Sequence, residues 1–448
     1  MNLNVLSRSI KYIFRAFLFL LPFQTIWIYR AVTIQGAKWQ YGTLGFYGTE
    51  ILLWVGVILF MAWYLKKRKI FSSDTEFSWT KDRLFLFSCL VFLLYSFASI
   101  FWAVDQSLAL QYSLWLLEAV LLISVFISGP FEPKKLVAWF TAGGALQAVL
   151  GIYQFATQST FALDWLGLAA HPVAQSGVSV IEGGYIGRWL RAYGAFPHPN
   201  MLGGYLTLVV ITLLSVISVR GYDFENKKVI LTLVLMVLSA GVFVSFSRAA
   251  WLVLVVVLLF TAFHVFFHRK AHPAEVVDSL IVTTALFVIL AIISYPLVGT
   301  RLSLSSATEQ KSIDQRVAGL ETSLELFENN ALVGVGAGNY TAAMIEKFDQ
   351  PGWFFQPVHN IFALFLVEFG LIGLVLLILA GIAYNYFMFY RRQVDPDDAF
   401  YLSMIIFAVL ILGSFDHYLI SSFVGLMSLA VVLGLFSRLH LHTSASEK

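Results

Sequence analysis

Three arginines and one histidine stand out in this sequence because their side chains could together bind a phosphate-bearing substrate and activate a nucleophile. Arg191, Arg248 and Arg316 carry planar guanidinium groups, which bind phosphate oxygens in pairs. His359 carries an imidazole, whose neutral form can accept a proton near pH 7. The four residues come from four separate segments, so this chemistry requires a fold that brings them to one place.

Each of the four also has an ordinary structural interpretation. Arg188 and Arg191 would share a face if their segment were helical, and such an interfacial helix would place both against lipid phosphates. Arg248 could reach the membrane surface from a helix end, Arg316 could be a solvated residue beside an apolar stripe, and His359 could be structural. The functional interpretation gains weight if all four lie on the same side of a membrane.

Polar neighbours could support such a site. His198 and Asn200 lie in a segment whose prolines prevent a continuous helix, and Asn200 is a plausible N-cap for the helix that follows. Asp416 lies in an apolar run, where an ionisable residue is a functional candidate by default. The supporting candidates are Arg188, His198, Asn200, Asn360 and Asp416.

Glycines occur in two patterns near these residues. The run Gly334–Gly338 has bare amides that could cradle an anion, but no Walker lysine follows, so a plain turn is the better interpretation. On a helix that carries His359, both Gly370 and Gly373 would share the histidine's face. Gly-x-x-Gly would then let a neighbouring helix approach closely.

The composition indicates where the chain resides. Hydrophobic residues make up 59% and charged residues 12%, with a net charge of +3 and a mean hydropathy of +0.80. Soluble globular chains carry roughly 25% charged residues, so a soluble enzyme, a disordered protein and a nucleic-acid binder are excluded. The chain is therefore expected to be a polytopic membrane protein. Cys89 is the sole cysteine, which excludes an intramolecular disulfide.

The apolar runs predict about twelve transmembrane helices in an all-α protein, since a helix needs about 20 apolar residues to cross a bilayer. The runs lie near residues 10–28, 49–65, 84–103, 108–128, 136–157, 200–219, 229–247, 249–267, 279–298, 358–381, 398–418 and 420–437. We interpret residues 1–448 as one integral membrane domain with an uncleaved first span.

Lysine and arginine clusters orient these spans by the positive-inside rule. Clusters such as Lys66–Lys69 and Lys134–Lys135 fall in alternate connections, which predicts that both termini are cytoplasmic. Residues 158–199 and 299–357 then form two long outer loops, and apolar spacing around Val317 predicts an amphipathic helix in the second. The three arginines and His359 all fall on the outer side, while no His, Asp and Glu cluster has clear metal-ligand spacing.

An ordered set of motifs resembles the O-antigen ligase and polymerase superfamily of bacterial membrane glycosyltransferases. The motifs span about residues 185–375. They are Arg191-x-x-Gly194 with Pro199-Asn200-x-Leu202, Ser247-Arg248-x-Ala250-Trp251, Arg316 upstream of Leu332-x-Gly334-x-Gly336-x-Gly338, and His359-Asn360 before Gly370-x-x-Gly373.

The resemblance implies a GT-C-like helical fold in the bacterial inner membrane, with its site facing the periplasm or cell exterior. The donor would be a glycan on undecaprenyl diphosphate, and no metal or cofactor would be needed. Arg191, Arg248 and Arg316 would bind the diphosphate. His359 would act as general base on the acceptor hydroxyl or bind the diphosphate itself, with inversion at the anomeric carbon.

The acceptor stays open at this point. A ligase would transfer the glycan to lipid A–core, and this is the favoured interpretation. The alternatives are a polymerase that extends another lipid-linked repeat, a protein O-oligosaccharyltransferase, and an anion transporter. A transporter predicts inverted repeats and broken helices near the middle of the membrane, and the sequence indicates neither.

Overall fold

Helices dominate the chain, as its composition predicts. The computed structural model describes residues 2–70, 83–183, 187–217, 228–267, 274–303, 307–391 and 396–446. Short strands are the only other regular elements in this part, which confirms the all-α class of polytopic membrane protein. The basic segments within 71–82, 218–227, 268–273 and 392–395, which contributed to the predicted orientation, lie outside the described residues.

Twelve helices correspond in order to the predicted spans. They are α1 (Leu3–Leu20), α2 (Gly48–Ile70), α3 (Arg83–Ala98), α4 (Gln106–Ser128), α5 (Pro133–Thr157), α6 (Pro199–Ile217), α7 (Lys228–Val244), α8 (Arg248–Phe267), α9 (Ala274–Ile293), α13 (Ile361–Asn385), α14 (Pro396–Phe415) and α16 (Phe423–Ser446). Among the described residues, eight helices are long and apolar enough to cross a membrane, and three further apolar helices are shorter. The total of twelve crossings stays a prediction.

The predicted first span, residues 10–28, is wrong in its bounds. Asn2 caps α1 by accepting a hydrogen bond from the amide of Asn4, and the helix ends shortly before Pro22. Residues 26–28 belong instead to strand β1 (Ile26–Arg30).

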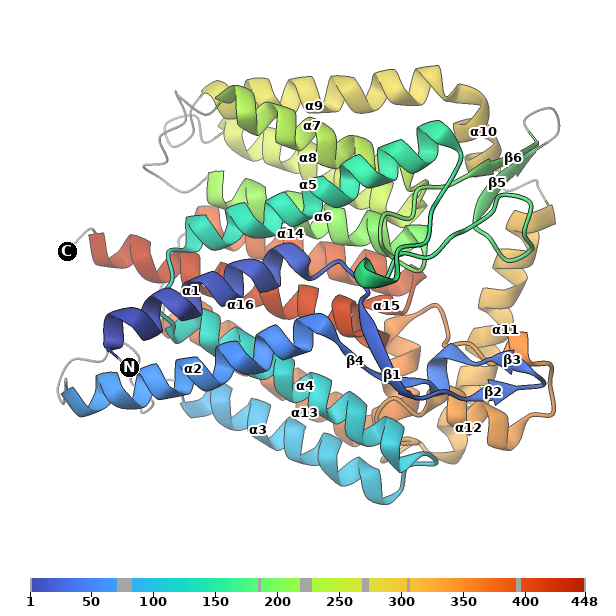
Figure 1. The fold of residues 1–448 in the computed structure, drawn as a ribbon, viewed down its shortest axis with the longest axis horizontal. Helices are drawn as coiled ribbons and strands as arrows, with labels where there is room; N and C mark the ends of the chain where they lie inside the picture. Colours follow the sequence, from blue (N-terminus) through green and yellow to red (C-terminus); the bar gives the residue numbers. More distant parts are fainter. Residues whose placement is uncertain are drawn as a thin grey trace.

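Three antiparallel strand pairs lie at one end of the helical bundle (Figure 1). The strands are β1, β2 (Thr33–Ile34), β3 (Ala37–Lys38), β4 (Leu44–Tyr47), β5 (Val180–Gly183) and β6 (Gly187–Leu190). The helices α10 (Tyr295–Ser303), α11 (Ala307–Asn329) and α12 (Tyr340–Lys347) lie at the same end, which we call the loop-rich end. Both chain termini lie at the opposite end (Figure 1). The strands at 26–47 make a third long connection, which the sequence did not predict.

The core of the bundle surrounds α6. In its apolar stretch 89% of the residues are buried, and the helix contacts α5, α7, α8, α14 and α16. One hydrophobic cluster includes residues from Leu6 in α1 to Phe436 in α16, and the interpretation as one membrane domain stays a prediction. The first residues of α6 are therefore held firmly at the loop-rich end.

A break inside α13 is filled by the glycine-containing turn that precedes it in the chain. Gly370 has φ 63° and ψ −168°, which interrupts the helix. The amides of Val335 and Gly336 donate to the carbonyls of Val367 and Glu368. The glycine run is thus a structural turn. The break at Gly370 admits this turn and not a helix, whereas Gly373 faces Tyr95 of the neighbouring helix α3, where the predicted close approach is found.

We expect Gly370→Ala to destabilise the protein, because a Cβ would lie 2.4 Å from the Leu332 carbonyl oxygen and the φ, ψ pair suits only glycine. Backbone strain alone costs about 1–3 kcal/mol. A thermal melt in detergent measures the loss. Gly381→Ala is the matched control, since a Cβ on this other α13 glycine meets nothing within 4 Å. Equal melting temperatures for the two variants would contradict the prediction.

Candidate functional site

The site begins at the N-terminus of α6. The His198 side chain caps this helix, because its Nδ1 accepts a hydrogen bond from the Asn200 amide at 3.1 Å. Its Nε2 must then carry the hydrogen and donates to Ser179 Oγ at 2.9 Å. The prediction that Asn200 is the N-cap is therefore wrong. His198 takes that role, and the Asn200 side chain bonds elsewhere.

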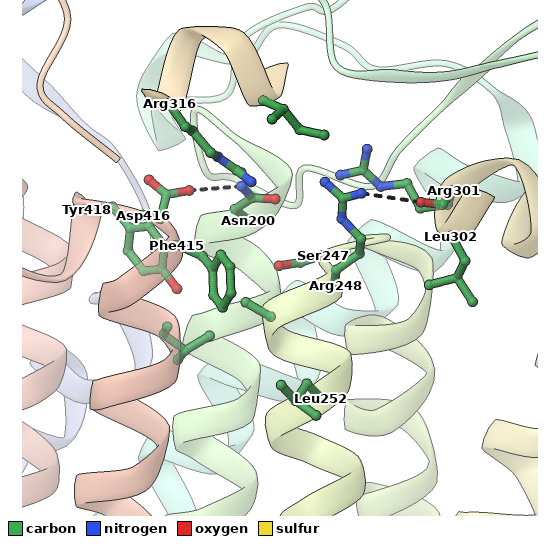
Figure 2. Close-up of a pocket in the computed structure, with 13 residues that line it drawn as sticks. Asn200, Ser247, Arg248, Leu252, Arg301, Leu302, Arg316, Phe415, Asp416 and Tyr418 are labelled. Atoms are coloured by element: carbon green, nitrogen blue, oxygen red, sulfur yellow. Dashed lines mark hydrogen bonds between the residues drawn. The ribbon is translucent and has the colours of Figure 1, made fainter. Parts of the chain in front are cut away.

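Asn200 connects Arg191 to Asp416. Arg191 Nη2 donates to Asn200 Oδ1 at 2.7 Å, and Asn200 Nδ2 donates to Asp416 Oδ2 at 2.8 Å. Figure 2 shows the second of these bonds at one side of a cavity. Arg191 is only 4% exposed, so this arginine supports the wall of the site from behind.

Arg188 lies away from this network. Arg188 belongs to β6, and its side chain forms an ion pair with Glu182 of β5 at 3.6 Å. Its Nε donates a hydrogen bond to the Val173 carbonyl at 2.9 Å. The segment is a hairpin, so the alternative of an interfacial helix is wrong. The Arg188 side chain therefore holds the strand pair to the segment at residues 173–175 that precedes it.

The turn between α7 and α8 organises three arginines. The Ser245 carbonyl accepts a hydrogen bond from Arg191 Nε at 2.9 Å, and the Phe246 carbonyl accepts one from Arg301 Nε at 3.1 Å. Arg248 follows as the first residue of α8, and its Nη1 donates to the Arg301 carbonyl at 3.4 Å. Phe246 has a left-handed φ of 48°, which marks the tight reversal of the chain here.

Three arginines line one cavity of about 360 Å³ (Figure 2). Arg248 comes from α8, Arg301 from α10 and Arg316 from α11. The remaining lining residues are Asn200, Ser247, Ala249, Leu252, Leu302, Ile313, Leu412, Phe415, Asp416 and Tyr418. Its size falls in the range of about 300–1,000 Å³ typical of ligand pockets. The cavity therefore offers guanidinium groups beside an apolar wall from α8 and α14.

His359 lies next to the cavity wall and directly before α13. Asn360 caps that helix, with Oδ1 accepting from the amides of Phe362 and Ala363 at 2.9 and 3.0 Å. The placement of His359 on the helix was therefore wrong by two residues. His359 Nδ1 contacts Asp416 Oδ1 at 3.3 Å, and the histidine side chain remains 33% exposed. Asp416 thus contacts both the histidine and the Asn200 network.

The electrostatics keep Asp416 charged and two nearby histidines neutral. Burial raises the pKa of Asp416, but the hydrogen bond with His359 and the charge interactions with the surrounding histidines together hold the pKa below its usual range. Burial lowers the pKa of His198 to about 3 and that of His417 to about 4. An ionised Asp416 can only accept, so the Nδ1 of His359 carries the hydrogen, and in the neutral ring Nε2 is then the acceptor atom.

The arginines repel one another across the cavity. Burial, together with the charges of neighbouring arginines, lowers the pKa of Arg191 to about 10 and that of Arg301 to about 8. Burial also lowers the pKa of Arg316, against the opposing charge of Asp416. This concentration of positive charge is the arrangement that a polyanionic ligand would stabilise.

One group of side chains could hold a metal ion on distance alone. The candidate ligand atoms of His359, Asp416 and His417 lie within 4.8 Å of one another. Each already has a protein partner: Asp416 accepts from Asn200, and His417 Nδ1 contacts Ser421 Oγ at 2.6 Å. The nearby arginines also disfavour a cation, so hydrogen bonding explains this group better than metal binding.

The structure brings together most of the residues that sequence analysis selected. Arg191, Asn200, Arg248, Arg316, His359 and Asp416 meet at the loop-rich end, with His198 and Asn360 as helix caps. Sequence analysis missed Arg301, which no motif marks. It also missed Tyr41, whose ring lies edge-on to that of His417 at 6.0 Å.

Comparison with known proteins supports the resemblance. Residues 231–378 match the family model described as O-Antigen ligase, and this segment contains Arg248, Arg301, Arg316 and His359. No curated protein matches the chain. The match supports membership of the O-antigen ligase and polymerase superfamily, and with it a membrane glycosyltransferase of that type.

Proposed function

We propose that this protein transfers a glycan from undecaprenyl diphosphate to an acceptor hydroxyl, and that it acts as an O-antigen ligase on lipid A–core. The observation that carries the proposal is the cavity in which three arginines face the Asp416–His359 pair. The family match, which is described as O-Antigen ligase, supports a membrane glycosyltransferase of the ligase and polymerase type.

The cavity suits a lipid diphosphate. A diphosphate diester carries two negative charges, and guanidinium groups bind such oxygens in pairs. The apolar residues Leu252, Leu412 and Phe415 lie on the sides of α8 and α14 that line the same cavity, where a prenyl chain could continue into the bilayer. Arg248, Arg301 and Arg316 would stabilise the charge that develops on the leaving diphosphate.

His359 is suited to act as the general base. Asp416 orients the ring through Nδ1, so Nε2 can take the proton from the acceptor hydroxyl. The hydroxyl oxygen attacks the anomeric carbon while the bond from that carbon to the diphosphate oxygen breaks. The electron pair leaves with the diphosphate. Attack from the side opposite the leaving diphosphate would invert the anomeric carbon.

Arg191 has a different role in this proposal from the one the resemblance implied. Because it is buried behind Asn200, it orients Asn200 and the turn at Ser245 and does not contact the diphosphate. Its positive charge still adds to the field in the cavity.

The loop-rich end would face the periplasm, with both termini in the cytoplasm and the chain in the inner membrane. Both termini lie at the end opposite the site, which is compatible with this orientation (Figure 1). Lipid-linked glycans and lipid A–core would meet the cavity from the outer leaflet.

A strain that lacks this gene and is complemented with wild type or His359→Ala tests the function. We expect the uncomplemented strain to hold lipid A–core without polymer while lipid-linked polymer accumulates, and wild type alone to restore transfer. Core that carries one repeat would indicate a polymerase. A glycan profile unchanged by the deletion would contradict both.

Purified protein should transfer the glycan at the same rate with and without EDTA, because the proposed chemistry depends on arginines and one histidine. The measurement is the initial rate of glycan transfer in detergent. Activity that EDTA abolishes and added divalent cation restores would contradict this prediction and point to His359, Asp416 and His417 as ligands.

A further inference from the structure

Arg301 differs from the other cavity arginines because no sequence motif marks it. It lies on α10, a nine-residue helix that follows α9 and contacts β5. Its Nε donates to the Phe246 carbonyl, one residue after the carbonyl that Arg191 holds. The two arginines thus hold adjacent carbonyls of the turn that carries Arg248, and Arg301 also lines the cavity.

The cavity has two sides of different character. Figure 2 shows Arg316 directed toward Asn200 and Asp416, whereas Arg248 and Arg301 lie beside each other on the other side. The Asp416 side adjoins His359, so the reacting sugar must lie there. Apolar residues lie below both sides, with Leu302 and Leu252 nearer Arg301 and Phe415 nearer Asp416 (Figure 2). The position of His359 is therefore what assigns the sugar-bearing phosphate to the Asp416 side.

We infer that Arg301 is a phosphate-binding residue and forms, with Arg248, the subsite for the phosphate that carries the prenyl chain. Arg316 then serves the phosphate attached to the sugar. This inference rests on the proposed lipid-diphosphate donor. It orients that donor in the cavity, with the prenyl phosphate near Arg301 and the sugar phosphate near Arg316. Burial and the neighbouring arginines lower the pKa of Arg301 to about 8, and a bound phosphate would relieve this repulsion.

Binding of farnesyl phosphate and farnesyl diphosphate to the full-length protein in detergent tests the assignment. The single phosphate of farnesyl phosphate is attached to the prenyl chain, so it should occupy the Arg301 subsite. We expect Arg301→Gln to lower the affinity for both ligands by about ten- to hundredfold, which is the range for loss of a charged hydrogen bond. Isothermal titration calorimetry measures these affinities. Arg316→Gln should lower the affinity for farnesyl diphosphate and leave the affinity for farnesyl phosphate unchanged.

The controls separate the possible failures. Lys347→Gln removes one positive charge at the loop-rich end, where Lys347 pairs with Glu325, and should leave both affinities unchanged. Arg301→Lys keeps the positive charge but lacks the paired donors of the guanidinium group, so it should lower the affinity for both ligands by a smaller factor. This variant still tests the assignment if the glutamine variant fails to fold.

Wild-type affinity for both ligands in the Arg301 variants would overturn the inference while leaving the proposed function intact. The reversed pattern, in which Arg316→Gln weakens the monophosphate and Arg301→Gln does not, would overturn the direction of the donor. Wild-type protein that binds neither ligand would overturn the proposed function itself.

Discussion

Replacement of His359 by glutamine is expected to lower kcat for glycan transfer by about 10²–10⁴-fold, the usual contribution of a positioned general base. The glutamine amide can still donate a hydrogen bond to Asp416, as His359 does, but its carbonyl oxygen cannot take a proton at neutral pH. Donor binding should therefore change little. The measurement pairs single-turnover kinetics with the Kd for the lipid diphosphate.

The comparison of turnover with binding separates the two roles considered for this histidine. Equal losses of turnover and donor affinity would mean that His359 binds the diphosphate. Wild-type turnover would mean that another group accepts the proton. His264→Gln is the control, because this histidine belongs to α8 near the opposite end of that helix and stacks on Phe400. It should not alter kcat.

The sequence predicted those parts of the site that depend on residue type and on the side of the membrane. Arg248 and His359 could be grouped with Arg316 because the first two lie next to apolar runs and the third lies in the outer loop between two runs, whose directions the positive-inside rule predicts. Topology alone brings such residues to one end of a bundle. The helices themselves follow from the long apolar runs, because a continuous apolar run of this length indicates a transmembrane helix and not a strand.

The details that the sequence did not predict depend on contacts between distant segments. Arg301 matters because its Nε meets the Phe246 carbonyl across 55 positions of sequence, and nothing local marks that contact. His198 takes the cap position because α6 begins at Pro199, and the Asn200 side chain bonds Asp416, which follows α14. The break at Gly370 has the same cause, since the turn that fills it is a separate segment.

The strands at residues 26–47 illustrate a different difficulty. The apolar residues Ile26 to Ile28 continue the first hydrophobic run, so a span of about 20 residues seemed to extend through them. Pro22 ends the helix earlier, and pairing with β4 then determines the structure of the remainder. A short strand of this kind has too few residues for a period of two to be recognised.

Lysine at position 248 or 191 is expected to impair transfer severely, but for two different reasons. Arg248 lines the cavity, so Arg248→Lys should remove the fork that binds diphosphate oxygens. Loss of one such donor costs about 10²–10³-fold in kcat. The melting temperature should stay near that of wild type, because the Arg248 side chain is only half-buried.

Arg191→Lys should lower both activity and stability. One ammonium group cannot replace the two bonds from Nε to the Ser245 carbonyl and from Nη2 to Asn200, and loss of a charged hydrogen bond costs about 1.5–3 kcal/mol. Arg438→Lys is the matched control, since Arg438 also holds two carbonyls, those of Ile127 and Phe131, but on α16. It should lower the melting temperature and leave kcat unchanged. Full activity in both the Arg191 and Arg248 variants would contradict the assignment of this cavity to a diphosphate, whereas a stable but inactive Arg191→Lys protein would mean that Arg191 reaches the ligand directly.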